Sequence, residues 1–342
     1  MELALYDPRD GYYASAAQKS GKAGDFYTSV DVSALFGATI AEQLVEMWRL
    51  LGSGEFHLVE AGAGHARLAR DILDAAAAHH PDFYRRLRVT LVERSSSARA
   101  AHRETLGSHV SLLASSSDTL PDNIDGAIVA NELLDALPVI VMQMTGDGLR
   151  EVAVDERDGV LVEELRPLPH HDTAWSLPAI EPGQRLEIGD EASVWMRGAA
   201  ASLSRGFLLI FDFGYTKSAD FFRSHPEGTL MAYRSHRASG HAWLEDPGGC
   251  DITAHVDFDA IRRVADAHGL HTLGIVDQRD FLLSLGLVDR LETGEDRRAT
   301  LQRLAARPLI MPGGLGDTMK AMVFGKGIGA PALRGLQSGR LT

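Results

Sequence analysis

The stretch that decides the fold is residues 58–73, LVEAGAGHARLARDIL. Its apolar start predicts a buried strand, its glycines a sharp turn, and its later residues an amphipathic helix that opens at His65. Gly62 and Gly64 allow the backbone to turn tightly and leave room for a ligand to lie against it. Free N–H groups in the first helical turn point toward the same place. Glu60 ends the strand, where open α/β sheets hold their ligands.

Two classes of ligand use such a turn. A dinucleotide site needs a third small residue, in the pattern G-x-G-x-x-G, where the helix packs close to the pyrophosphate. Arg67 occupies that position here, and the carboxylate of Glu60 would repel a pyrophosphate. An acid followed by x-Gly-x-Gly instead suits a ligand with a cationic, amine-bearing end. The pattern resembles motif I of the class I S-adenosylmethionine (SAM) methyltransferases, and a tight turn without a ligand is the alternative.

A second acid supports a nucleoside ligand. Residues 88–93, RVTLVE, predict another apolar strand, which ends in Glu93. In nucleoside-binding α/β folds, an acid at the end of the second strand accepts hydrogen bonds from the ribose hydroxyls. An exposed glutamate at a strand end is the alternative. Two acids at consecutive strand ends, Glu60 and Glu93, together favour the nucleoside.

Bulk composition narrows the class of protein. The chain has 342 residues, of which 45% are hydrophobic and 24% charged, as in ordinary globular proteins of one large or two smaller domains. A formal net charge of −13 argues against nucleic acid as a partner. The single cysteine, Cys250, excludes an internal disulfide and a multi-cysteine metal site, and we expect no metal. No apolar run reaches the roughly 18 residues that a membrane span needs, and residues 1–10 show no signal-peptide pattern. We therefore expect a cytoplasmic protein without a membrane span.

The order of the elements predicts three parts. Residues 1–54 contain a polar loop and a helix at 32–51 with Asp31 as its N-cap, which either closes over the ligand as a lid or packs on the sheet. Residues 55–326 alternate strands and helices, including a short strand at 110–113, which predicts a parallel doubly wound sheet. β-rich insertions are expected at about 139–187 and 216–256. Residues 327–342 are expected to form a flexible tail.

Several uncommon blocks occur in one order along the chain. They are residues 5–13 (LYDPRDGYY), 24–28 (GDFYT), 35–37 (LFG), 60–64 (EAGAG), 131–138 (NELLDALP), 212–215 (DFGY) and 251–258 (DITAHVDF). Together they resemble the MidA-like family of SAM-dependent methyltransferases, and the resemblance covers about residues 3–326. The blocks at 131–138 and 251–258 are the most specific. One departure is His65-Ala66, where the family usually has Arg-Gly. The family also usually has a helix before the LYDP block, whereas this sequence starts at that block, so either substrate closure differs or the start is trimmed.

The resemblance implies an α/β fold, a Rossmann-like seven-stranded sheet with helices on both faces. It implies S-adenosyl-L-methionine as cofactor and S-adenosyl-L-homocysteine as product. Mitochondrial members of the family are assembly factors that dimethylate an arginine of a respiratory complex I subunit. A protein or peptide that presents a basic side chain is therefore the expected substrate, with a complex I subunit as one example.

The polar cluster after the fourth predicted strand carries the proposed chemistry. A guanidinium stays protonated in proteins, so it needs carboxylates that hold its fork and favour electron density on the attacking nitrogen. Glu132 and Asp135 lie in the right place for this role. Asn131 is expected to bind the amino-acid end of SAM or the substrate. The alternative is that Asn131 and Asp135 cap the turn.

Other candidates come from separate blocks. His255 is a candidate base or wall residue, although a lone histidine is more often structural, and Asp212 is a candidate supporting contact. Tyr12 and Tyr13 are expected to pack, and the basic loop of Arg234, His236 and Arg237 is expected to be solvated. The predicted cofactor contacts are Asp25, Thr28, Glu60, Gly62, Gly64, Glu93 and Asn131.

Three functions remain open at this point. The first is a SAM-dependent protein arginine methyltransferase. The second is a SAM methyltransferase that acts on a small molecule or a peptide. The third is a non-catalytic assembly factor that keeps the fold.

Overall fold

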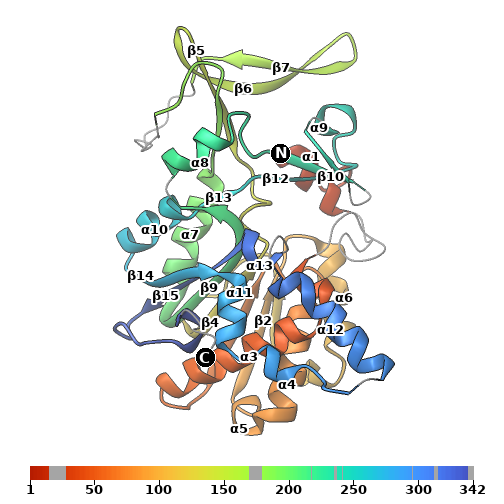
Figure 1. The fold of residues 1–342 in the computed structure, drawn as a ribbon, viewed down its shortest axis with the longest axis vertical. Helices are drawn as coiled ribbons and strands as arrows, with labels where there is room; N and C mark the ends of the chain where they lie inside the picture. The colour runs from red at the N-terminus through yellow and green to blue at the C-terminus, as the bar shows by residue number, and fades with distance from the viewer. Residues whose placement is uncertain are drawn as a thin grey trace.

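The computed structural model describes residues 1–14, 28–168, 179–216, 218–234, 237–240, 242–294, 296–311 and 315–337. Its central sheet has the strand order β14-β15-β9-β4-β1-β2-β3, and a short β13 pairs with β9 off this path (Figure 1). Strands β9, β4, β1, β2 and β3 run parallel, whereas β15 is antiparallel to both of its neighbours. This confirms the predicted α/β fold with a mostly parallel central sheet, and the short β13 adds an eighth strand in the described part of the chain to the seven that were expected. The strands are β1 (Phe56–Ala61), β2 (Leu87–Val92), β3 (Leu113–Ser117), β4 (Ile124–Asn131), β9 (Leu203–Tyr215), β13 (Val256–Asp257), β14 (His271–Asp277) and β15 (Met319–Lys326).

Helices cover both faces of this sheet, so its inner strands are apolar along almost their whole length. One core cluster joins the sheet to α3, α4, α11 and α12, and a second joins the opposite face to α7 and α10. The helices are α3 (Leu35–Leu50), α4 (Arg67–His79), α5 (Pro81–Tyr84), α6 (Ser96–Leu106), α7 (Asp190–Ser202), α10 (Phe258–Ala267), α11 (Gln278–Ser284), α12 (Arg297–Ile310) and α13 (Leu315–Thr318), with the 3₁₀ turns η2 (Gly107–Leu112), η3 (Val288–Arg290) and η4 (Arg334–Leu336).

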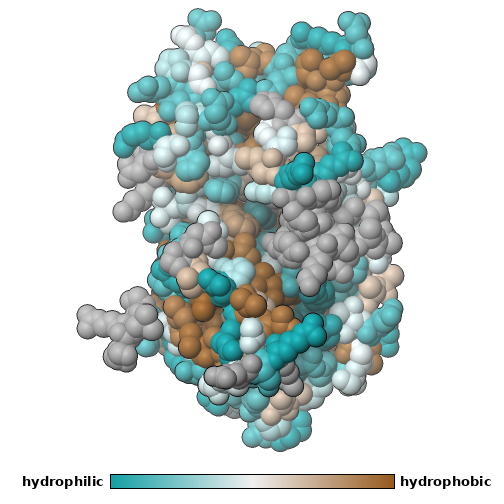
Figure 2. Space-filling view, turned by 45° about the vertical axis from the view of Figure 1, so that its right-hand side comes forward, coloured by the Kyte–Doolittle hydropathy of each residue, from teal (hydrophilic) through white to brown (hydrophobic). Residues whose placement is uncertain are grey.

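Two smaller sheets stand beyond the carboxyl ends of the main strands, in the upper half of Figure 1. They fall in the stretches that the sequence marks as insertions. The four-stranded sheet contains β5 (Ile140–Thr145), β6 (Gly148–Arg157), β7 (Val160–Arg166) and β8 (Arg185–Ile188), and the three-stranded sheet contains β10 (Met231–Arg234), β11 (Arg237–Ser239) and β12 (Asp251–Thr253), accompanied by α8 (Ser218–Ser224) and α9 (Ala242–Glu245). In the space-filling view, hydrophilic side chains cover much of the surface, and hydrophobic ones form patches at its top and in its middle and lower parts (Figure 2).

The N-terminal segment differs from the prediction. It contains α1 (Glu2–Tyr6), η1 (Tyr12–Ala14) and the single-turn α2 (Ser29–Val32) before α3 begins at Leu35. Asp31 is not the N-cap of the long helix. Thr28 caps α2 instead, because its side chain accepts from the Asp31 N–H while the Asp31 carboxylate accepts from the Thr28 N–H.

Two further expectations differ from the structure. Residues 107–112 form η2 instead of the predicted strand at 110–113, and β3 follows at Leu113–Ser117. This edge strand pairs only with β2, so its serines face solvent and give no apolar signal. The described part of the tail, up to residue 337, is anchored: Leu333 is 1% exposed, and the Gly335 N–H donates to Gln43 Oε1 at 3.0 Å. Across the described ranges, no helix combines the length and apolar character that crossing a membrane requires.

Candidate functional site

A cavity of about 660 Å³ lies at the carboxyl ends of β1, β2 and β4. Three segments that follow these strands contribute to its walls, together with the N-terminal segment and the three-stranded sheet. The site residues predicted from the sequence that line it are Thr28, Glu60, Gly62, Gly64, Glu93, Asn131, Glu132, Asp135 and His255. Asp25 lies outside the described residues. The structure thus brings together side chains that lie up to 227 positions apart in the chain, from Thr28 to His255.

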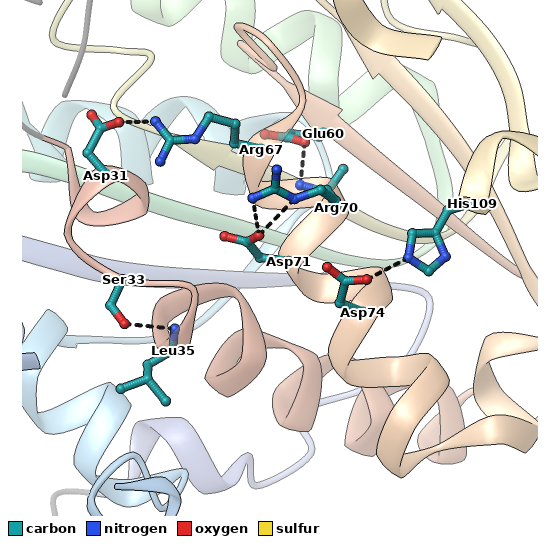
Figure 3. Close-up of polar contacts among 10 residues, drawn as sticks. Asp31, Ser33, Leu35, Glu60, Arg67, Arg70, Asp71, Asp74 and His109 are labelled. Carbon is teal, nitrogen blue, oxygen red and sulfur yellow. Dashed lines mark hydrogen bonds and ion pairs between the residues drawn. The ribbon is translucent and has the colours of Figure 1, made fainter. Parts of the chain in front are cut away.

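The glycine turn after β1 is built for close approach. Gly62 and Gly64 have φ values of +70° and +48°, which side chains rarely tolerate. Ala66, the N-cap of α4, is also left-handed and has no side-chain cap. Glu60 supplies that cap, because its Oε2 accepts the Ala69 N–H at 3.0 Å (Figure 3). Helix α4 therefore begins at Arg67, two residues later than predicted, and Glu60 both caps it and lines the cavity.

Glu93 braces the same turn from the neighbouring strand. Its Oε2 accepts the Gly64 N–H at 2.8 Å, and its Oε1 accepts the Ser95 N–H at 2.7 Å. Burial raises the pKa of Glu93 above its usual value, and these two hydrogen bonds partly offset that rise. Burial raises the pKa of Glu60 as well, to about 8. Two acids predicted from consecutive strand ends therefore lie on one wall of the cavity.

The turn after β4 has an unusual backbone at Glu132, where φ is +50°. The Glu132 Oε1 atom accepts the Ser29 N–H at 3.0 Å and the Asn131 Nδ2 at 3.2 Å. Burial raises the pKa of Glu132 to about 8, and the nearby Asp135 carboxylate adds to the rise. The carbonyl oxygen of the Asn131 side chain is buried, and within the described part of the chain it has no hydrogen-bond partner.

Asp212 organises this turn from β9. Its side chain is fully buried and accepts the N–H groups of Leu133 at 3.2 Å, Leu134 at 2.8 Å and Phe213 at 2.9 Å. Burial raises the pKa of Asp212 to about 7. The pKa of Asp135 is raised well above its usual range by burial and by the neighbouring carboxylates of Asp212 and Asp251.

Asp251, which is buried and lines the cavity, was not among the predicted site residues. It accepts a hydrogen bond of 2.7 Å from the Tyr13 hydroxyl. Tyr13 therefore also faces the cavity, whereas Tyr12 packs in the core as expected. Asp251 opens the DITAHVDF block, which was the available signal. Tyr6 completes this wall, and its hydroxyl donates to the Ala136 carbonyl oxygen at 3.0 Å.

His255 lies at the edge of the cavity. Its Nδ1 atom is buried and finds no hydrogen-bond partner among the described residues. Burial lowers the pKa of His255 to about 4, so the ring is neutral near pH 7. It can accept or donate one hydrogen bond to a ligand. Arg234 instead pairs with Asp246 at the surface, 2.7 Å away, and His236 lies outside the described residues.

The glycine turn and the polar groups that line the cavity fit a nucleoside with an amine-bearing end. The left-handed glycines leave the turn open, and Glu93 lies beside it, directly after β2. The unpaired Asn131 carbonyl oxygen needs a donor that a ligand amine can supply. Within the described ranges, no group of three or more His, Cys, Asp or Glu side chains could hold a metal ion.

Curated relatives cover most of the chain. A Drosophila melanogaster protein named protein arginine methyltransferase NDUFAF7 homolog, mitochondrial, is 31% identical over 85% of this chain and 71% of its own length. The protein arginine methyltransferase NDUFAF7, mitochondrial, of Danio rerio is 29% identical over 85% of this chain and 73% of its own length. The expectation of a cytoplasmic location is contradicted by this comparison, because these relatives are named as mitochondrial proteins.

Two solved structures and a family model also match the chain. A Burkholderia thailandensis protein crystallised with S-adenosyl-homocysteine superposes with a TM-score of 0.89 at 32% identity, over 99% of this chain and 89% of that one. A native crystal structure from the same organism gives 0.87 at 31% identity, over 99% and 88% of the two chains. A family model described as S-adenosyl-L-methionine-dependent methyltransferase matches residues 39–276. The chain therefore belongs to the family of S-adenosyl-L-methionine-dependent methyltransferases.

Proposed function

We propose that this enzyme methylates an arginine side chain of a partner protein, such as a subunit of respiratory complex I. The observation that carries the proposal is the buried acidic end of the cavity, formed by Glu132, Asp135 and Asp251 with Asp212 behind them. In the described part of the chain, no ion pair involves Glu132, Asp135 or Asp212. Burial, together with neighbouring carboxylates, raises their pKa values, and a bound cation would favour the ionised forms.

A guanidinium group supplies that cation. It is planar, always charged and able to bond two carboxylates through its fork of N–H donors. A small amine would satisfy one carboxylate but would leave the others buried and unpaired, which is costly. The relatives named protein arginine methyltransferases support the same substrate class.

The side chains at this end of the cavity have two roles in methyl transfer: they hold the guanidinium and accept its proton. Bound SAM supplies a methyl group on a positively charged sulfur. We assign Glu132 and Asp135 to hold the guanidinium so that one nitrogen faces the methyl group. One of these carboxylates takes the proton that the guanidinium loses as the N–CH₃ bond forms and the S–CH₃ bond breaks. The Glu132 Oε1 atom already accepts two hydrogen bonds, which leaves Oε2 for this role.

Methyl transfer should rise with pH. The free-enzyme pKa of Glu132 is raised to about 8, so the carboxylate is mostly protonated at pH 6 and mostly ionised at pH 9. Only the ionised form holds the cation and accepts its proton. We expect the rate to increase through the region around pH 8 when SAM and the peptide substrate are both far below their KM values, because this condition reports the ionisation of the free enzyme. A profile that is flat from pH 6 to 9 would exclude Glu132 as the ionising group.

Cofactor binding should depend on Glu93. A glutamine at this position keeps one acceptor but turns an NH₂ group toward either the Gly64 or the Ser95 N–H. We expect the Glu93→Gln variant to bind S-adenosylhomocysteine about tenfold or more weakly, because charge-assisted hydrogen bonds are lost. Isothermal calorimetry measures this change. Glu104→Gln, an exposed change on α6, is the control and should leave the dissociation constant unaltered.

Radiolabelled SAM separates the three candidate functions. The enzyme is incubated with a cell lysate and methyl-³H-SAM, and the products are divided by size. A labelled protein whose hydrolysate contains methylarginine supports the proposal. Label on a small molecule or a peptide instead would mean that the enzyme methylates that class of substrate, and it would contradict the proposal. Co-purification of a partner with no label in any fraction would indicate a non-catalytic assembly factor.

A further inference from the structure

Arg67 stands where a dinucleotide fold would need a small residue, and it has a specific partner. Its guanidinium pairs with the Asp31 Oδ1 atom, which comes from α2 (Figure 3). The Asp31 side chain is 1% exposed, whereas that of Arg67 is 30% exposed. The pair therefore joins the N-terminal segment to the first turn of α4, directly after the glycine turn.

The second oxygen of Asp31 fixes the start of α2. Oδ2 accepts the Thr28 N–H at 3.1 Å and the Thr28 hydroxyl at 2.9 Å. A helix of four residues has no stability of its own, because too few hydrogen bonds offset the cost of nucleation. The conformation of residues 28–32 therefore depends on this carboxylate and on the cation that compensates its charge.

The same segment reaches the acidic end of the cavity. The Ser29 N–H donates to Glu132 Oε1 at 3.0 Å, and the Ser29 hydroxyl bonds the Gln278 side chain. Thr28, Val30, Asp31 and Arg67 all line the cavity. One continuous set of contacts thus runs from α4 through α2 to Glu132.

We propose that Arg67 and Asp31 are positioning residues, which hold residues 28–32 against the cavity so that the cofactor is retained and the Ser29 N–H reaches Glu132. The role in retaining the cofactor is argued from the family assignment and the geometry, whereas the link to catalysis rests on the proposed function of Glu132. Without Arg67, the buried Asp31 carboxylate would lose its charged partner, and a buried unpaired charge is strongly unfavourable. The segment would then move to let water reach Asp31.

The test compares neighbouring arginines on one helix. Arg67→Met removes the charge and keeps an apolar stem, and Arg67→Lys keeps the charge. The matched control is Arg70→Met, because Arg70 pairs with Asp71 at 2.8 Å on the same helix and does not line the cavity (Figure 3). We expect S-adenosylhomocysteine to bind roughly tenfold more weakly to Arg67→Met, about threefold more weakly to Arg67→Lys, and unchanged to Arg70→Met.

The pH profile of kcat/KM tests the link to Glu132. The Ser29 N–H lowers the pKa of Glu132, so its loss in Arg67→Met should move the rise in kcat/KM to higher pH. The charged groups that face Glu132 are Asp135 on its own turn, Asp31 on α2 and Asp212 on β9. Arg67→Met leaves Asp135 and Asp212 in place, whereas Asp31 moves with the segment. The Asp31 carboxylate raises the pKa of Glu132 by less than the Ser29 N–H lowers it, so the loss of both still moves the profile to higher pH. A simple loss of stability would lower the amplitude without moving the profile.

The outcomes test cofactor retention and the link to Glu132 separately. Weaker cofactor binding together with a shifted pH profile supports both parts of the proposal. Weaker binding with an unshifted profile supports retention and overturns the link to Glu132. Arg67→Met that binds the cofactor as tightly as the wild type, or Arg70→Met that weakens binding equally, overturns the proposal. Circular dichroism and thermal melting confirm that each variant is folded, and Arg67→Lys still tests the ordering of affinities should Arg67→Met unfold.

Discussion

The Glu132→Gln variant should lose methyl transfer by about a thousandfold while its affinity for S-adenosylhomocysteine stays within about threefold. Glutamine cannot take a proton, and its NH₂ group would face the cationic substrate. Its carbonyl oxygen can still accept the hydrogen bonds that Ser29 and Asn131 donate to Glu132, so residues 28–32 keep their place. The expected result is therefore a loss in kcat without a matching loss in cofactor binding.

Initial rates with radiolabelled SAM and calorimetric titration with S-adenosylhomocysteine measure the two quantities. Glu55→Gln is the control, because Glu55 is exposed and lies outside the cavity. Turnover equal to that of the wild type would remove Glu132 from the reaction. Equal losses in turnover and cofactor binding would make Glu132 a structural support of the N-terminal segment.

The sequence alone was sufficient to predict most of the main sheet and the acids at the carboxyl ends of its strands. Parallel strands covered on both faces are apolar throughout, and their carboxyl ends meet at one edge. Glu60, Glu93 and Glu132 could therefore be placed together from local patterns alone, and all three line the cavity. The edge strand β3 was predicted at the wrong residues, because it pairs with the sheet on one side only and lacks the apolar run of the inner strands.

The contacts between distant segments could not be predicted. Asp31 and Arg67 are 36 residues apart, and Ser29 and Glu132 are 103 apart, so no short pattern joins them. The TSVD sequence at residues 28–31 does carry a local signal, because a threonine followed three residues later by an acid forms a capping box. That signal was available, and it identifies Thr28 as the cap instead of Asp31.

Asp212 should be the carboxylate whose removal most affects folding. In the Asp212→Ala variant, the N–H groups of Leu133, Leu134 and Phe213 lose the fully buried side chain that accepts their hydrogen bonds. Each buried, unsatisfied N–H costs roughly 1–3 kcal/mol, so we expect the free energy of unfolding to fall by about 3 kcal/mol or more. Because these N–H groups fix the turn that carries Glu132 and Asp135, methyl transfer should be lost as well.

The Asp212→Asn variant distinguishes the hydrogen bonds from the charge. Burial raises the folded-state pKa of Asp212 to about 7, above the unfolded value near 4, so its contribution to stability is largest below pH 4 and is lost as the pH rises through 7. Asparagine keeps one acceptor oxygen and does not titrate. Urea unfolding at several pH values should therefore show that Asp212→Asn loses less free energy of unfolding than Asp212→Ala. Between pH 4 and 7, its free energy of unfolding should also depend less on pH than that of the wild type. An alanine variant as stable as the wild type would mean that water or a relaxed turn satisfies the three N–H groups, and Asp212 would then be retained for its charge near Glu132.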